Sequence, residues 1–427
     1  MKKVLIITYY WPPSGGAGVQ RWLKFVKYFR DFGWEPIVYT PLNGEFPVID
    51  LSLEKDIPSG IKVIKHPIWE PYSFYKKFTG QKKSSKINHG FLSENKKPKF
   101  SEKISVWLRG NFFIPDARVF WVKPSIKFLT KYLTENPVDA IVSSGPPHSM
   151  HLIANNLKQK FHVKWIADFR DPWTEIDFYK DLMLSNWADK KHRKLEHEIL
   201  TNADEVVVIG NTMAEGFKNI VNREYQVITN GYDESDIAIN KVLDEKFSLA
   251  HIGTINKDRN PESLWIVLQE KIQNTVFASK LEIKLIGKVD YQVIQQIEQY
   301  KLTDYLNKVD YIPHEEVIKQ QQSSFILLLL LNNTPNAKGI LTGKFFEYLA
   351  AKRPILAIGP TDGDVAKILN ETDAGRISDF NDTQSLSNNI DYYFNQFLSK
   401  TKESKTPNIS QYSRRELTKE FSKILNK

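Results

Sequence analysis

The chain has 427 residues, a formal net charge of +9 and no cysteine. A chain of this length exceeds what one hydrophobic core usually holds, so we expect two domains. The lack of cysteine excludes a disulfide framework, a thiolate nucleophile and a cysteine-based zinc site. Every apolar run is far shorter than the ~20 residues that cross a bilayer, so we expect a cytoplasmic protein.

The first half of the chain alternates predicted strands and helices. Met1–Ile7 is better explained as part of a first strand than as a signal peptide, because it runs into Tyr-Tyr-Trp-Pro-Pro without a small-residue cleavage site. The expected strands are Val4–Tyr9, Pro36–Thr40, Ala140–Ser143, Lys164–Ala167 and Glu205–Ile209. The expected helices are Arg21–Phe32, Pro124–Leu133, 149–160 and Trp187–Thr201. Such alternation is typical of a doubly wound parallel sheet.

A second alternating series follows a turn signal at Asn230-Gly-Tyr-Asp233. The expected strands are Phe247–Ile252, Leu281–Ile286, Val309–Ile312, Phe325–Leu331 and Ile355–Ile358. The expected helices are Pro261–Glu270, Asp290–Tyr300, Glu315–Gln322 and one that starts near Thr342. We therefore predict an α/β protein with two facing Rossmann-like domains, residues 1–235 and 236–408. Ligands of such sheets bind beyond the carboxyl ends of the strands, here in an interdomain cleft.

A basic, aromatic insertion at about 70–123 interrupts the first domain. Between Lys76 and Arg109 it has ten Lys and Arg residues against Glu94 and Glu102, with aromatic residues interleaved. This mixture is compatible with an anionic membrane surface or a lipid-linked acceptor, and equally with a solvated insertion. Nucleic acid binding is the least favoured alternative, so we expect no nucleic-acid partner.

The segment from Lys338 to Gly359 is the most informative in the chain. Thr342 can cap a helix start at the carboxyl end of a strand, where free backbone N–H groups favour phosphate. Lys344 adds a positive charge in the first turn, and Glu347 lies on the same helix face, where it could accept hydrogen bonds from sugar hydroxyls. The combination indicates a nucleotide or nucleotide sugar. The alternative is an ordinary crossover helix with a solvated Lys–Glu pair.

A second cationic loop follows the first strand of the second domain. Arg259 lies in this loop, after Gly253-Thr254 and just before a helix that starts with Pro261. Together with Lys344 it would give two cations flanking one diphosphate. They would stabilise a leaving group without a metal ion, so no cofactor and no metal site are expected.

Three loops of the first domain carry further candidate residues. Gly15 and Gly16, after the first strand, allow a bulky anion to approach the backbone, although their spacing fails the dinucleotide fingerprint and a plain turn also explains them. His148 is a candidate for hydrogen bonding or proton handling, whereas His151 falls inside the next helix and is expected to pack.

The run Asp168-Phe-Arg-Asp-Pro-Trp173 concentrates three charges after a strand. We expect Asp168 or Asp171 to hold acceptor hydroxyls and Arg170 to lie near phosphate. The alternative is an internal bridge from Arg170 to a carboxylate that shapes the loop. His148, Asp168, Arg170 and Asp171 are thus the candidates for catalysis.

In the order and spacing of these motifs the chain resembles the family 4 glycosyltransferases of the GT-B fold. The resemblance implies that the second domain binds a nucleotide-diphosphate sugar, the first binds the acceptor, and transfer retains the anomeric configuration. It implies that Arg259 and Lys344 neutralise the diphosphate, that Glu347 holds the ribose, and that the backbone at Gly15 and Gly16 approaches the phosphates. It also implies that residues 409–427 return to the first domain as a helix.

Two positions depart from the family pattern. Gly339 stands where many members have the first of two glutamates, and Gly253-Thr254 replaces the usual Gly-Arg pair. We expect a retaining, metal-independent hexosyltransferase acting on a cell-surface polysaccharide or glycolipid acceptor, either free in the cytoplasm or peripheral at the membrane. The alternatives are a nucleotide-sugar epimerase or hydrolase of the same fold, and a catalytically silent nucleotide-sugar-binding partner subunit.

Overall fold

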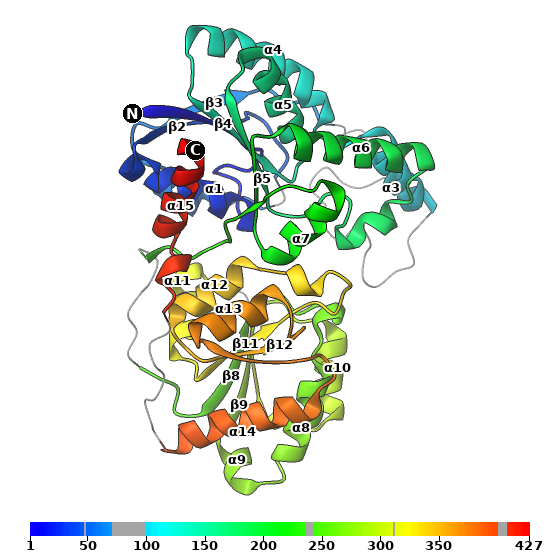
Figure 1. Ribbon diagram of the computed structural model, residues 1–427. Coiled ribbons are helices and arrows are strands. Elements are labelled where there is room, and N and C mark those ends of the chain that lie inside the picture. Colours follow the sequence, from blue (N-terminus) through cyan, green and yellow to red (C-terminus); the bar gives the residue numbers. More distant parts are fainter. Residues whose placement is uncertain (47, 71–99, 235–241, 311, 400–407) are drawn as a thin grey trace. The chain divides into compact units, whose positions relative to one another are not determined.

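The computed structural model describes residues 1–46, 48–70, 100–234, 242–310, 312–399 and 408–427. The chain forms two compact units (Figure 1). Unit 1 comprises Met1–Thr229 and Arg414–Lys427, and unit 2 comprises Asn230–Ser413. Of the ten basic residues counted in the insertion, only Lys103 and Arg109 lie within the described ranges.

Unit 1 contains a seven-stranded parallel sheet in the order β3-β2-β1-β4-β5-β6-β7. Its strands are β1 Lys2–Ile7, β2 Trp34–Pro41, β3 Lys62–His66, β4 Ala140–Gly145, β5 Lys164–Phe169, β6 Glu205–Val208 and β7 Gln226–Val227. The central strands are apolar and buried on both faces, as parallel sheets require. The strand order reverses between β1 and β4, and such a switch point is where open α/β sheets bind ligands.

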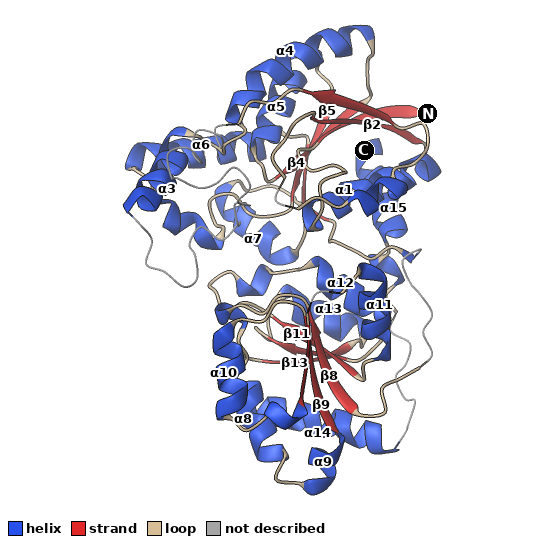
Figure 2. Cartoon of the chain, turned by 180° about the vertical axis from the view of Figure 1, so that it is seen from behind, coloured by secondary structure: helices blue, strands red, loops and turns tan. Residues whose placement is uncertain are grey.

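Helices cover both faces of this sheet (Figure 2). They are α1 Ala17–Tyr28, α3 Phe100–Phe112, α4 Val119–Glu135, α5 Ser149–Phe161, α6 Asn186–Asn202, α7 Asn211–Ile220 and α15 Arg414–Asn426. On one face α15 packs against α1, where the rings of Trp22 and Phe421 lie 5.4 Å apart edge to face. Phe25 and Phe29 contact the same phenyl ring, so the C-terminal segment completes an aromatic core of unit 1.

Unit 2 contains a six-stranded parallel sheet in the order β10-β9-β8-β11-β12-β13. Its strands are β8 Phe247–Ile252, β9 Leu281–Ile286, β10 Leu306–Val309, β11 Ile326–Leu330, β12 Ile355–Ile358 and β13 Gly375–Ser378. Its helices are α8 Glu262–Lys271, α9 Thr275–Lys280, α10 Tyr291–Gln299, α11 His314–Ser323, α12 Gly343–Ala351, α13 Asp364–Thr372 and α14 Thr383–Ser399. The switch point of this sheet lies between β8 and β11.

The predicted fold class, α/β with two doubly wound parallel sheets, is confirmed. The predicted strand Val309–Ile312 is wrong, because the structure has Leu306–Val309 at this edge. The strand predicted at Lys164–Ala167 continues to Phe169, which places Asp168 inside β5 rather than in the following loop. Among the described residues, no helix is both long and apolar enough to cross a membrane.

Candidate functional site

Two glycines bring backbone segments together at the carboxyl edge of the unit 2 sheet. Gly253 has φ +129° and Gly287 has φ +120°, backbone conformations that residues other than glycine rarely adopt. The N–H of Gly253 donates to the carbonyl of Ile286 at 2.7 Å. A Cβ on Gly287 would lie 2.8 Å from the Gly253 oxygen. Glycine is therefore needed at both positions to let β8 and β9 end in contact.

Helix α12 begins beside this glycine pair, as the sequence predicts. Thr342 is its N-cap, and the Thr342 hydroxyl accepts a hydrogen bond from the Phe345 N–H at 3.4 Å. Lys344, in the first turn, extends over Gly253, where a Cβ would fall on the lysine ammonium group. The structure thus brings together two residues that are 91 positions apart in the chain, at the helix start and at the strand end.

Arg259 approaches the same edge from the 3₁₀ turn Lys257–Arg259. Its Nε donates to Asn332 Oδ1 at 2.9 Å, and its Nη1 donates to the Thr254 carbonyl at 3.2 Å. Thr254 stands at the position where the family pattern has an arginine. Arg259, five residues after Thr254, places its guanidinium group beside that position.

Lys344 and Arg259 influence each other electrostatically. The pKa of Lys344 is lowered to about 8, chiefly by burial and also by the positive charge of Arg259, while Glu347 opposes the shift. Two cations held this close repel each other, so an anion bound between them would relieve the repulsion. Glu347 itself is exposed one turn along α12, and its Oε2 accepts a hydrogen bond from Gln321 at 3.3 Å.

His251 is a member of this group that the sequence analysis missed. It lies in β8 two residues before Gly253, and its Nε2 is 3.3 Å from the Lys344 ammonium nitrogen. A single histidine within the apolar strand Phe247–Ile252, just before the glycine, was the available signal.

In unit 1, Asp168 is fully buried, and its hydrogen-bond partners among the described residues are other side chains of the protein. Its carboxylate accepts hydrogen bonds from Arg21, from Trp22 Nε1 at 2.9 Å and from the Ser144 hydroxyl at 2.9 Å. With no exposed surface, this carboxylate is placed to hold the sheet edge together and does not reach solvent. The bridge that shapes the loop thus runs to Arg21, and not to Arg170.

His148 and His151 are both buried and converge on Gly145. Ser143 Oγ accepts from Trp165 Nε1 at 2.8 Å and lies within hydrogen-bond distance of His151 Nδ1, at 2.8 Å. His151 Nε2 has no hydrogen-bond partner among the described residues. Burial lowers the pKa of His151 to about 3 and that of His148 well below 6.5, so both rings are neutral. His148 also stacks on Trp173 with centroids 4.6 Å apart.

The remaining predicted residues of unit 1 differ in how open they are. Arg170 donates from Nη2 to the Pro146 carbonyl, and Asp171 is exposed. The N–H of Gly15 donates to Val48 O at 2.9 Å, so its close approach is to the protein's own chain. Gly16 is the N-cap of α1, and a Cβ there would meet nothing within 4 Å. Of the two glycines, Gly16 therefore has the open surroundings.

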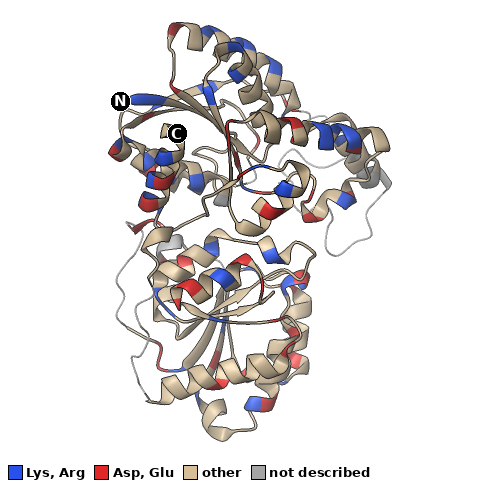
Figure 3. Ribbon diagram, in the orientation of Figure 1, with Lys and Arg blue, Asp and Glu red and all other residues tan. Residues whose placement is uncertain are grey.

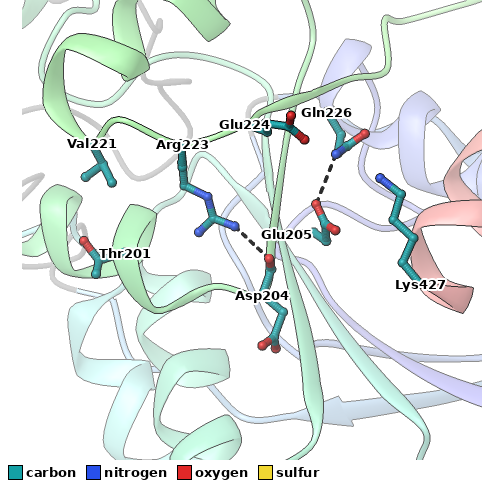
Figure 4. Close-up of a pocket in the computed structure, with 8 residues that line it drawn as sticks. All are labelled: Thr201, Asp204, Glu205, Val221, Arg223, Glu224, Gln226 and Lys427. Atoms are coloured by element: carbon teal, nitrogen blue, oxygen red, sulfur yellow. Dashed lines mark hydrogen bonds between the residues drawn. The ribbon is translucent and has the colours of Figure 1, made fainter.

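A polar hollow of about 390 Å³ lies at the opposite, amino edge of the unit 1 sheet (Figure 4). Arg223 donates there to the Asp204 carbonyl at 2.7 Å, and Gln226 donates to Glu205 at 3.2 Å. Because Glu205 and Gln226 begin their strands, this hollow is remote from the carboxyl edge of the sheet. The two hydrogen bonds also show that these polar groups already pair with each other. Among the described residues there is also no cluster of three metal-binding side chains.

Comparison with known proteins gives likeness in structure only. No family model matches the chain, and no curated protein matches it in sequence. HepE of Anabaena, solved with UDP-glucose, is 12% identical with a TM-score of 0.61, and the match covers 100% of both chains. TarM of S. aureus, solved with fondaparinux, α-GlcNAc-glycerol and UDP, is 12% identical with a TM-score of 0.59, again over 100% of both chains.

The lipopolysaccharide outer core galactosyltransferase WaaB is also similar in structure. It is 12% identical with a TM-score of 0.58, over 100% of this chain and 99% of WaaB. By its title WaaB is a galactosyltransferase, and the structural neighbours are of the GT-B type. Identities this low establish architecture alone, and the two parallel sheets agree with it. The chain therefore has the GT-B fold.

Proposed function

We propose that the protein is a retaining glycosyltransferase that moves a sugar from a nucleotide-diphosphate donor bound by unit 2. One observation carries the proposal: Lys344 and Arg259 converge at the switch-point edge beside the capped start of α12. Such a place suits phosphate twice, because backbone N–H groups and fixed cations both face it. HepE and TarM, which share the fold, were solved with UDP-glucose and UDP.

In this mechanism the residues of unit 2 stabilise the leaving group. Charge grows on the diphosphate as the bond from the sugar to the phosphate oxygen breaks. Lys344 and Arg259 would offset that charge from a partly dehydrated site, where preorganised cations act strongly. Glu347 would accept hydrogen bonds from the ribose hydroxyls. No step requires a metal ion or another cofactor.

We place the acceptor on unit 1, with the exposed Asp171 and the half-buried Arg170 as its polar candidates and His148 nearby. The proposed acceptor is a cell-surface polysaccharide or glycolipid. WaaB by its title acts on lipopolysaccharide, and TarM was solved with a GlcNAc-glycerol compound. These neighbours support a polyol or glycan acceptor. Asp168, being buried, would act on the acceptor only by fixing the strand end that precedes Arg170.

We further propose a cytoplasmic protein with peripheral contact at an anionic membrane. The described end of the insertion supports this, because Trp107, Leu108 and Phe112 of α3 are 41%, 38% and 63% exposed; we call these three residues the α3 surface. Figure 3 shows Lys and Arg residues along α6, which contacts α3. Exposed aromatic residues beside cations are typical of proteins that rest on anionic lipid.

The donor site is tested by thermal unfolding with a panel of nucleoside diphosphates and their sugars. A ligand at about 100 times its Kd adds about 2.7 kcal/mol, which raises Tm visibly. We expect one nucleotide to stabilise the wild type, Lys344→Ala and Glu347→Ala to lose the shift, and the exposed Lys280→Ala to keep it. No shift with any ligand would contradict the donor site.

Turnover then separates the three activities. Sugar transfer to a lipid-linked or polysaccharide acceptor supports the transferase. Donor conversion without acceptor indicates an epimerase or hydrolase. Donor binding without turnover, even with membrane extract present, indicates a silent partner subunit.

A further inference from the structure

His251 is a buried polar residue for which donor binding alone gives no role. It is 1% exposed and belongs to β8, which is paired with β11. Nδ1 is 3.0 Å from the Leu328 carbonyl oxygen, and Nε2 is 3.3 Å from the Lys344 ammonium nitrogen. The imidazole therefore links the centre of the sheet to the first turn of α12.

These contacts define the tautomer of the ring. A carbonyl oxygen only accepts, so the tautomer that satisfies both contacts carries its hydrogen on Nδ1 and donates it to Leu328; the backbone of Thr254 also acts on the ring. Burial lowers the pKa of His251 well below 6.5, and the charge of Lys344 lowers it further. The ring is neutral, and its Nε2 is an acceptor aimed at a group that can only donate.

A neutral acceptor holds an ammonium group without cancelling its charge. A carboxylate in the place of His251 would form an ion pair and compete with a bound phosphate. The other charged groups that affect Lys344 are Arg259, which lowers its pKa, and Glu347, which raises it. Gly253 leaves no room for a side chain beneath the ammonium group. Lys344 is thus held in place while its charge remains available to an anion.

We propose that His251 is a positioning residue, which holds the Lys344 ammonium group over Gly253 so that it meets a donor diphosphate. The role in diphosphate binding rests on the proposed function. The contact between His251 and Lys344 does not, and the two can be tested separately.

Two substitutions divide the contacts of the ring. His251→Gln keeps an acceptor at about the reach of Nε2, whereas His251→Asn can still bond Leu328 but is too short for Lys344. The pH dependence of Lys344 acetylation by acetic anhydride, followed by mass spectrometry, reports its ionisation without any ligand. Loss of an acceptor disfavours the ammonium form, so the Asn variant should lower the apparent pKa of Lys344 by about one unit. The Gln variant should keep the apparent pKa that Lys344 has in the wild type.

An Asn profile equal to that of the wild type, in a protein with unchanged circular dichroism, would overturn the proposal. If the Asn variant fails to fold, Lys344→Met gives the reciprocal test. Removing the donor should shift the ¹⁵N resonance of His251 Nε2, and an unchanged resonance would overturn the contact.

Binding of UDP and of uridine tests the functional half. His251→Asn should weaken UDP about tenfold and leave uridine unchanged, and His251→Gln should restore UDP binding. Unchanged UDP binding alongside a shifted labelling profile would overturn the role in diphosphate binding. Failure of the wild type to bind any nucleoside diphosphate would instead refute the donor site, while the labelling result would stand.

Discussion

The carboxylate of Asp168 receives Arg21 Nη2 at 2.7 Å and Nε at 3.1 Å, and both side chains are fully buried. The same guanidinium group donates to the carbonyls of Ile228 and Thr229 at 2.9 and 2.8 Å. Arg21 therefore connects α1, the end of β5 and the last residues of unit 1 before the chain enters unit 2.

Replacing Asp168 with Asn should destabilise unit 1 rather than only its chemistry. The change leaves the Arg21 charge buried without its counter-ion, which costs about 3–5 kcal/mol. Urea unfolding measures the loss, and the exposed Asp181→Asn should change stability by less than about 0.5 kcal/mol. A stable Asp168→Asn protein that has lost only sugar transfer would favour direct contact with the acceptor instead.

Gly253→Ala should impair both stability and anion binding. The φ of +129° disfavours alanine by about 1–3 kcal/mol, and the new methyl group displaces the Lys344 ammonium group. Unfolding free energy and the Kd for UDP should both worsen. Gly343→Ala is the matched control, because a Cβ there meets nothing within 4 Å and alanine favours the helix. If the control lost as much stability, the strain would not be specific to position 253.

Affinity for UDP should fall as pH rises through about 8. Burial lowers the pKa of Lys344 to about 8, and the diphosphate favours the protonated lysine, so above this pH binding requires proton uptake. The expected loss approaches tenfold per pH unit at its steepest. Calorimetric titration from pH 7 to 9 measures it, and Lys344→Arg, which stays charged, corrects for ionisation of the ligand. If the affinity for UDP fell equally steeply with pH in the wild type and in Lys344→Arg, Lys344 would not be the titrating group.

The same pKa has an opposite effect on folding. Because the folded value lies below the value of about 10.4 expected in the unfolded chain, the unfolded state binds more protons between these limits. The contribution of Lys344 to stability is unfavourable at pH 8 and below, and it improves as pH rises toward 10.4. Lys344→Met should remove this rise.

The α3 surface should bind anionic vesicles. Wild-type protein is expected to sediment with phosphatidylglycerol vesicles, to do so less with phosphatidylcholine, and to be released by salt. Trp107→Ser combined with Phe112→Ser removes two large exposed apolar side chains and should weaken binding at least tenfold. Tyr291→Ser, at a tyrosine that is 72% exposed in unit 2, is the control. No sedimentation of the wild type would show that the insertion is merely solvated.

The fold was largely predictable because the central strands are continuous apolar runs. The predicted bounds are those observed for Phe247–Ile252, Leu281–Ile286 and Ile355–Ile358, because every residue in them except the half-buried Glu282 is buried. The edge strands carry no such signal: Lys62–His66 was missed and the strand at Leu306–Val309 was misplaced, because their residues are mostly exposed or half-buried. Pairing with one neighbour, and not apolar burial, defines these strands.

The candidate site divides in the same way. The preference of threonine for helix N-caps predicted that Thr342 starts its helix. The rule that ligands bind at the carboxyl ends of parallel strands predicted that Lys344 and Gly253 belong to one site. The environments of Asp168 and His251 depend on residues far away in sequence, Arg21 and Leu328. A charge after a strand gives no indication of whether it will face solvent or a buried guanidinium group.

The position of α15 also affects how the molecule is made. Unit 2 is an uninterrupted stretch inserted within unit 1, and the helix Arg414–Asn426 that covers Trp22 and Phe25 is synthesised after it. Unit 1 therefore exposes a row of aromatic side chains until residues 414–426 have been synthesised. Although most of unit 1 precedes unit 2 in the chain, unit 1 is completed last. Chaperones can bind its exposed aromatic side chains until α15 packs against them.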